Sequence, residues 1–85
     1  MAIKNVLIVD DSATDTHLLS EMLKKNGYSI LTATSGEEAI NKAKKDKPDL
    51  ILMDIVMPGM SGFEATRAIT KDPETASIPV IVCST

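Results

Sequence analysis

Short apolar runs alternate along the chain with segments that have helical periodicity. Three of the runs are continuous, at residues 6–9, 50–53 and 80–83. Continuous runs of this length are typical of strands that are covered on both faces, as in a parallel sheet. A weaker run at residues 29–33 alternates polar with apolar positions, as an edge strand does. The pattern therefore predicts four strands.

The segments between the runs carry apolar residues at the spacing of one helix face. The residues expected to share a face are Leu18, Leu19, Met22 and Leu23 in the first segment, Ala39, Ile40 and Ala43 in the second, and Phe63, Thr66 and Ile69 in the third. Asn26-Gly27 is expected to end the first helix and Pro48 the second. Three helices are therefore predicted between the four strands.

The expected helix starts share one motif, a serine followed three positions later by an acid. The pairs are Ser12 and Asp15, Ser35 and Glu38, and Ser61 and Glu64. In this capping pattern the hydroxyl and the acid can bind backbone N–H groups that lack a partner in the first turn. Because the motif recurs after each of the first three strands, it strengthens the helix assignments.

The resulting order is β-α-β-α-β-α-β, and 85 residues are enough for one domain. Right-handed crossovers between parallel strands give an open α/β sheet with helices on its faces. Ligands bind to such sheets beyond the carboxyl ends of the strands. The residues directly after each apolar run are therefore the candidates for function.

Three carboxylates follow two of the predicted strands: Asp10 and Asp11 after the first run and Asp54 after the third. If these strands are neighbours, the three side chains converge at one end of the sheet. Two carboxylates about 4 Å apart repel by about 4 kcal/mol at an effective dielectric near 20, which favours a bound cation or a shared proton. Oxygen ligands with open water positions suit Mg²⁺ best. The competing interpretation is that Asp10 and Asp11 only end a strand and cap a helix.

The chemistry indicated by these acids is phosphoryl transfer to an aspartate. A carboxylate beside Mg²⁺ can attack a phosphoryl group and form an acyl phosphate, while the metal stabilises charge on the transferring oxygens. A hydroxyl of Ser84 or Thr85, directly after the fourth run, could hold one phosphoryl oxygen. Pro58-Gly59 fits a type II turn, which would direct the Val56 carbonyl toward the metal position.

Composition and charge exclude several other classes of function. The net charge is −3 and only 2% of the residues are aromatic, which argues against nucleic-acid binding through a basic surface or a stacking platform. The sequence has no apolar run of about 18 residues, so it predicts no membrane span. Asp10 and Asp11 interrupt the apolar stretch near the start of the chain, so a secretory signal is not expected. The single cysteine, Cys83, excludes an intrachain disulfide. A reducing, cytoplasmic setting is therefore expected.

Three segments of the chain resemble the receiver domain of bacterial response regulators. They are VLIVDDS at 6–12, DLILMDIVMPGMSGFE at 49–64 and IPVIVCST at 78–85. The resemblance implies a three-layer, flavodoxin-like α/β fold whose parallel sheet has the strand order 2-1-3-4. Stand-alone receivers of chemotaxis and twitching-motility systems look most similar.

The resemblance also implies roles for the candidate residues. Asp54 would accept phosphate from a sensor histidine kinase, and Asp10, Asp11 and Asp54 would hold Mg²⁺ together with the Val56 carbonyl. Ser84 falls at the family's switch hydroxyl, and Thr85 falls at the small residue after it. Such a protein is a regulatory phosphoacceptor rather than a turnover enzyme, and at most catalyses its own phosphorylation and dephosphorylation.

By comparison with the family, residues 1–85 are expected to form a receiver domain that is incomplete at its C-terminus. The last strand and the last two helices have no counterpart, and neither do the family's phosphate-pairing lysine and aromatic switch residue. Impaired phosphorylation is therefore expected. The exposed edge of the fourth strand and the uncovered sheet face predict a homodimer or higher oligomer through that edge.

Three other interpretations compete with a signalling phosphoacceptor. A truncated receiver could keep the fold and oligomerise without competence for signalling. A Mg²⁺-dependent phosphohydrolase with an aspartate nucleophile would carry Asp-x-Asp after the first strand, whereas this chain has Asp10-Asp11-Ser12. A flavodoxin-like FMN carrier would need a hydroxyl- or glycine-rich phosphate loop there, and two acids would repel phosphate.

Overall fold

The structure is a computed structural model and describes residues 3–55 and 61–83. In this part of the chain the strands are β1 (Asn5–Val9), β2 (Ser29–Ala33), β3 (Leu50–Asp54) and β4 (Val80–Cys83), and the helices are α1 (Ala13–Lys25), α2 (Gly36–Asp46) and α3 (Gly62–Lys71). These elements lie where the hydrophobic pattern predicts them. None of the three helices combines the length and the apolar character that a membrane crossing requires, as far as the described residues go.

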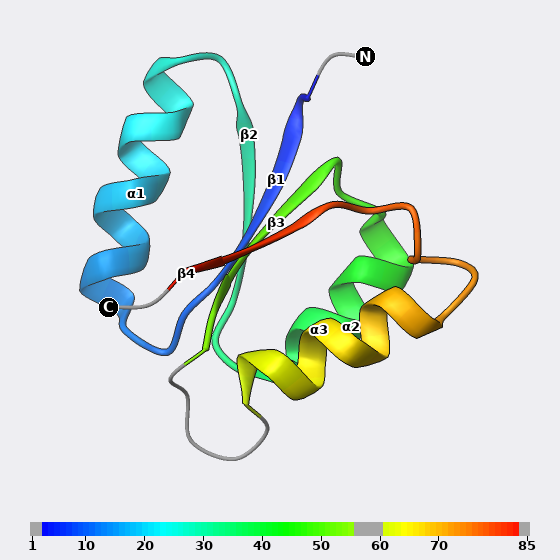
Figure 1. The fold of residues 1–85 in the computed structure, drawn as a ribbon. Helices are drawn as coiled ribbons and strands as arrows, with labels where there is room; N and C mark the ends of the chain where they lie inside the picture. The colour runs from blue at the N-terminus through cyan, green and yellow to red at the C-terminus, as the bar shows by residue number, and fades with distance from the viewer. Residues whose placement is uncertain (1–2, 56–60, 84–85) are drawn as a thin grey trace.

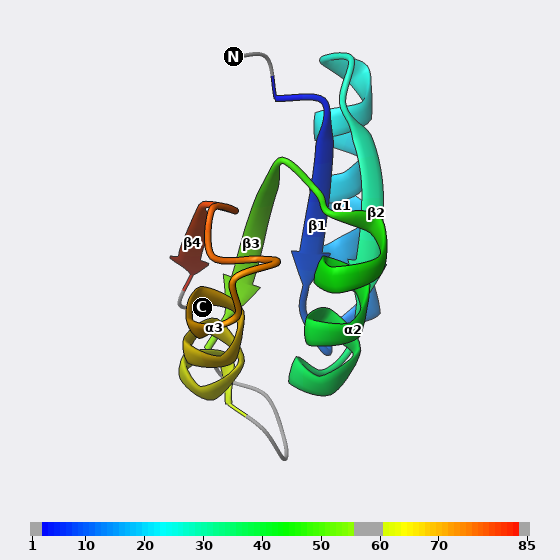
Figure 2. The same cartoon turned by 90° about the vertical axis from the view of Figure 1, so that its right-hand side faces the viewer.

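The strands form one sheet in the order β2-β1-β3-β4, and every neighbouring pair is parallel. α1 covers one face of the sheet, and α2 and α3 lie together on the other face (Figure 1, Figure 2). The three-layer, flavodoxin-like fold and the order 2-1-3-4 are therefore confirmed. Because β1 and β3 are neighbours, two apolar runs that are distant in sequence end at the same edge of the sheet.

The main core fills the space between the sheet and the α2–α3 layer. Its buried members are Leu7, Val9, Ala33, Ala39, Ala43, Ile51, Met53, Ala65, Ile69 and Ile78. Large side chains come from the strands β1 and β3, whereas α2 contributes only alanines to the buried set. Small residues let the helices approach the sheet closely.

Each helix begins at its predicted serine. The serine hydroxyl accepts the backbone N–H of the acid three positions on, at 3.4 Å for Ser12 and Asp15, 3.1 Å for Ser35 and Glu38, and 3.2 Å for Ser61 and Glu64. The acid of the second pair reaches beyond its cap, because Glu38 Oε1 accepts the N–H of Thr34 at 2.6 Å. At the other ends, positive φ angles of 90° at Gly27 and 46° at Lys47 turn the chain out of α1 and α2.

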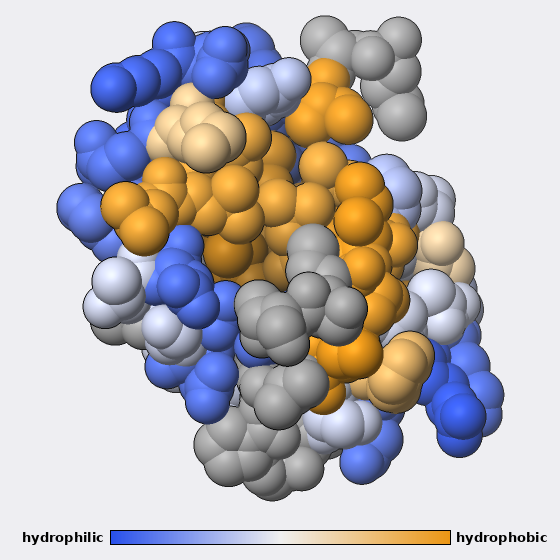
Figure 3. All heavy atoms as spheres, turned by 60° about the vertical axis from the view of Figure 1, so that its left-hand side comes forward, coloured by the Kyte–Doolittle hydropathy of each residue, from blue (hydrophilic) through white to orange (hydrophobic). Residues whose placement is uncertain are grey.

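The predicted apolar face of α1 is wrong in part. Leu19 and Leu23 are partly buried, but Leu18 and Met22 are 63% and 61% exposed. Figure 3 shows apolar side chains gathered over α1 and the strands beside it. Ile81 of β4, which is 51% exposed, adds to this surface. The described residues therefore leave an apolar surface on the face of the sheet that α1 covers.

The predicted face of α3 is wrong at Phe63. This side chain is 62% exposed, and the buried residues of the helix are Gly62, Ala65 and Ile69. In a helix of 3.6 residues per turn, Phe63 and Ile69 lie about 120° apart, so Phe63 falls at the margin of the face that Ile69 buries. Close packing of α3 against the sheet selects the neighbouring face, where the residues are smaller.

Candidate metal centre at the carboxyl edge of the sheet

Asp10 and Asp54 lie side by side because they end neighbouring parallel strands. Val9 and Met53 are partners in the register of β1 and β3, so the residue that follows each of them emerges at the same edge. One carboxylate oxygen from each of Asp10, Asp11 and Asp54 lies within 4.8 Å of the other two. The structure thus brings together the three acids that the sequence analysis singles out.

The three acids differ in their exposure to solvent. Asp54 is only 6% exposed, Asp10 is partly buried, and Asp11 is exposed. Burial of a charged carboxylate is unfavourable unless hydrogen bonds or a cation compensate for the lost hydration. Asp54 is therefore the most buried acid of the cluster, and Asp11 is the most accessible to solvent.

Hydrogen bonds fix the loop that carries Asp10. Its N–H donates to the carbonyl of Ala33 at the end of β2 at 3.0 Å, and its Oδ1 accepts the N–H of Ser12 at 2.9 Å. Ser12 in turn caps α1. The competing interpretation, that this acid supports the turn into the helix, therefore describes one of its contacts, but it does not explain the approach of two further acids.

The surroundings of Asp10 raise its pKa above the ordinary value. Loss of hydration by burial is the largest cause, and the negative charges of Asp54, Asp15 and Asp11 act in the same direction, whereas the hydrogen bond from Ser12 opposes them. Two carboxylates within 4.8 Å of each other repel by about 3.5 kcal/mol or more at an effective dielectric near 20. A cation at the cluster would remove both the repulsion and the cost of burial.

The donor set fits Mg²⁺. Carboxylate oxygens are hard ligands, and Mg²⁺ is commonly held by one or two carboxylates while water and phosphate oxygens fill its other positions. Val56, whose carbonyl is an expected ligand, lies outside the described residues, and so do Ser84, Thr85 and the Pro58-Gly59 turn. The roles of these residues stay predictions.

The sequence analysis missed Gly62, the first residue of α3. A Cβ at this position would meet the backbone of Asp54 and Ile55, so the glycine lies directly behind the deepest acid of the cluster. The signal in the sequence was a glycine directly after a capping serine. The same pair occurs at Ser35-Gly36 at the start of α2, so the pattern alone could not identify Gly62.

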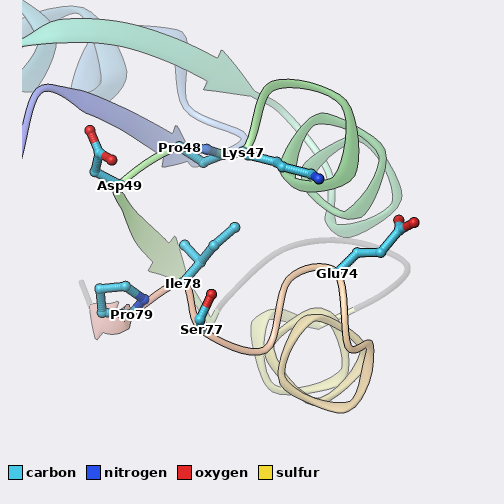
Figure 4. Close-up of a pocket in the computed structure, with 7 residues that line it drawn as sticks. All are labelled: Lys47, Pro48, Asp49, Glu74, Ser77, Ile78 and Pro79. Atoms are coloured by element: carbon cyan, nitrogen blue, oxygen red, sulfur yellow. The ribbon is translucent and has the colours of Figure 1, made fainter.

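A shallow pocket of about 260 Å³ lies at the opposite, amino edge of the sheet (Figure 4). Its charged side chains do not converge, because Asp49 points away from Lys47 and Glu74. Asp49 Oδ2 also accepts the backbone N–H groups of Lys4 and Asn5, each at 2.9 Å. The pocket therefore lacks the clustered charge that marks the carboxyl edge.

Comparisons with known proteins agree with this geometry. Residues 6–85 match the family model of the response regulator receiver domain. Protein PilH of Pseudomonas aeruginosa is 52% identical over 80 residues, which are 94% of this chain and 66% of that protein. The N-terminal domain of a response regulator receiver protein from Methanoculleus marisnigri superposes with a TM-score of 0.91 at 40% identity, over 95% of this chain and 66% of that one.

A third relative was solved with a metal. The receiver domain of sensor histidine kinase PA1611 from Pseudomonas aeruginosa, with a magnesium ion coordinated in its active site cleft, has a TM-score of 0.88 and 30% identity, over 95% of this chain and 66% of that one. The present chain thus spans about two-thirds of the length of these three relatives.

Proposed function

The chain belongs to the response regulator receiver domain family of two-component systems, and on this premise we propose that it is a regulatory phosphoacceptor phosphorylated on Asp54. The observation that carries the proposal is the position of this carboxylate. Asp54 is nearly buried at the end of β3, and oxygens of Asp10 and Asp11 lie within 4.8 Å of one of its own. A group held there is shielded from water on the side of the sheet and is reached from the side of Asp11.

In the proposed reaction a carboxylate oxygen of Asp54 attacks the phosphorus of a phosphohistidine. The O–P bond forms as the P–N bond breaks, the imidazole nitrogen keeps the electron pair, and an acyl phosphate remains on Asp54. Asp10 and Asp11 would hold Mg²⁺ together with Asp54. The ion supplies charge neutralisation for the phosphoryl oxygens when it is bound.

Three residues outside the described part of the chain complete the proposal. The Val56 carbonyl is proposed as a further metal ligand, the Ser84 hydroxyl as the group that holds a phosphoryl oxygen, and Thr85 as the small residue beside it. The support for these roles is the likeness to the family's sequence motifs.

The proposed partner is a sensor histidine kinase in the cytoplasm. Support for the kinase comes from membership of the family. The single cysteine is consistent with a reducing compartment, and the net charge of −3 disfavours nucleic acid as a partner.

Phosphorylation with a small-molecule donor such as acetyl phosphate tests the proposed function. We expect Mg²⁺-dependent labelling that maps to Asp54 by mass spectrometry and disappears in Asp54→Asn. Asp49→Asn, which removes an aspartate at the other edge of the sheet, should be labelled like the parent. Labelling that persists in Asp54→Asn would contradict the proposal, and a folded parent that is never labelled would favour a purely structural role.

We also propose that two or more copies associate through β4 and the apolar surface beside α1. Among the described residues, β4 is at the end of the sheet order. The exposed apolar side chains of Leu18 and Met22 lie on α1, and those of Ile81 and Val82 lie on β4. Covering such a surface is favourable in water. A dimer has a closed, two-fold arrangement that buries the same patch on both copies.

Light scattering tests the association. We expect a dimer or larger species that dissociates on dilution, and Leu18→Ser with Met22→Ser should weaken it. Phe63→Ser is the matched control, since Phe63 is as exposed as these residues but lies on the other side of the sheet. A parent that stays monomeric at high concentration would contradict the proposal.

A further inference from the structure

Gly62 lies where α3 begins, pressed against the last residues of β3. A Cβ built on it would overlap the carbonyl oxygen of Asp54 and would lie 2.7 Å from the Cα of Ile55 and 2.8 Å from the carbonyl carbon of Asp54. Real Cβ atoms essentially never come this close to other heavy atoms. The requirement for glycine is one of space.

Gly27, after α1, shows the contrast. Gly27 has a φ of 90°, and a Cβ on it would meet nothing within 4 Å. Glycine is needed there for its backbone conformation. At Gly62 the obstacle is the backbone that carries the proposed phosphorylation site.

The atoms that a Cβ would meet at Gly62 are all main-chain atoms, so no side-chain rotation can make room. Either α3 retreats or the Asp54–Ile55 backbone moves. α3 is held along its length, because Ala65 and Ile69 are 0% and 1% exposed in the core and the Ile69 carbonyl accepts the hydroxyl of Thr75 at 2.6 Å. We therefore expect the displacement to include the Asp54–Ile55 backbone.

We propose that Gly62 is a positioning residue for the metal centre, because its contact with the backbone of Asp54 sets where that carboxylate lies relative to Asp10 and Asp11. This role rests on the proposed function, and Gly62 would affect the metal centre without being a metal ligand. Residues that orient metal ligands commonly change metal affinity by about 10- to 100-fold when they are replaced. We therefore expect Gly62→Ala to weaken Mg²⁺ binding by about tenfold or more.

The experiment is a calorimetric titration of the parent, Gly62→Ala and Ala65→Gly with Mg²⁺. Circular dichroism first establishes that each sample is folded. Ala65→Gly is the matched control. It removes a buried methyl group and adds a flexible residue to the same helix, but adds nothing near Asp54. A loss of affinity in Gly62→Ala that is absent from Ala65→Gly is the expected result, and a purely structural role would not produce it.

If Gly62→Ala unfolds in buffer, the three proteins are compared in a stabilising osmolyte such as sucrose, which favours the compact state. Equal Mg²⁺ affinities of the parent and folded Gly62→Ala would overturn the inference and leave the proposed function standing. A folded parent that does not bind Mg²⁺ would overturn the metal centre of the proposed function and the inference with it.

Discussion

The two edges of the sheet each carry an aspartate with a shifted pKa, and the shifts have opposite signs. At the amino edge, hydrogen bonds from the N–H groups of Asn5 and Lys4 lower the pKa of Asp49. At the carboxyl edge, burial and the charges of neighbouring acids raise the pKa of Asp10. Backbone N–H groups thus stabilise the charged form of Asp49, whereas the surroundings of Asp10 disfavour its charged form.

This difference distinguishes an acid whose charge is stabilised by backbone N–H groups from an acid that lies among other acids. Asp49 ties the start of β1 to the start of β3, since it accepts N–H groups from a segment 44 and 45 residues away. Asp10 is surrounded by acids that weaken the fold when they are ionised together. Variants at the two edges should therefore differ in their response to Mg²⁺ and should show opposite responses to pH.

The largest expected effect is stabilisation of the parent by Mg²⁺. At a concentration about one hundred times Kd, a ligand that binds only the folded state adds about 2.7 kcal/mol to the free energy of unfolding. Asp54→Asn and Asp10→Asn should each lose most of this gain, and Asp49→Asn should keep it. Urea unfolding with and without Mg²⁺ measures the difference, and equal gains in all variants would remove the distinction between the edges.

Without divalent cations, Asp10→Asn should stabilise the protein by on the order of 1 kcal/mol, because it removes one charge from the acid cluster. The amide oxygen can still accept the N–H of Ser12 that now reaches Asp10 Oδ1. Asp49→Asn should instead destabilise the protein, because its two N–H donors then face a neutral acceptor. Urea unfolding in the presence of a chelator gives both values, and a destabilised Asp10→Asn would contradict this explanation.

The loop that follows α3 should affect stability alone. Thr75 is 1% exposed, and its hydroxyl donates to the Ile69 carbonyl at 2.6 Å. Thr75→Val should cost about 1 kcal/mol, because the buried carbonyl loses its donor. Thr70→Val, on the exposed side of α3, should change stability by less than about 0.5 kcal/mol. The stabilisation by Mg²⁺ should be the same in both variants, and a lost response in Thr75→Val would show that this loop also shapes the acid cluster.

The smallest expected effect is the dependence of stability on pH without metal. Because the folded pKa of Asp49 lies below its ordinary value of 3.8, its contribution is present above that value and is lost as the pH falls through the folded pKa. The folded pKa of Asp10 is raised, so its contribution is present below 3.8 and is lost as the pH rises through the folded pKa. The free energy of unfolding is measured between acid and neutral pH for the parent, Asp49→Asn and Asp10→Asn. The difference between the parent and Asp49→Asn should change with pH in the opposite direction to the difference between the parent and Asp10→Asn. Slopes of one sign would contradict the comparison.

The strands and helix starts were predictable because their signals are local. A run such as residues 50–53 reports burial on both faces, and each capping serine pairs with an acid three positions away. The faces of α1 and α3 were less predictable, because periodicity identifies an apolar stripe but not what lies opposite it. Leu18 and Met22 continue the stripe of α1 beyond the part that the sheet covers.

The acid cluster was predictable only on the condition that β1 and β3 are neighbours. Asp10 and Asp54 are 44 positions apart in the sequence, and the register of Val9 with Met53 brings them to one edge. Gly62 escaped prediction because its importance lies in a contact between two backbones. The sequence around a glycine does not indicate which strand end packs against it.

The proposed function requires that Asp10, Asp11 and Asp54 bind one divalent cation. Adding substoichiometric Mn²⁺ to the ¹⁵N-labelled protein tests it directly, because a paramagnetic ion broadens the amide signals nearest to it. We expect the signals of residues 10, 11 and 54 to broaden first, those of Lys47 and Ser77 at the amino edge to stay sharp, and excess Mg²⁺ to restore the spectrum. Broadening centred on Asp49 and Glu74, or broadening that Mg²⁺ does not reverse, would contradict the claim.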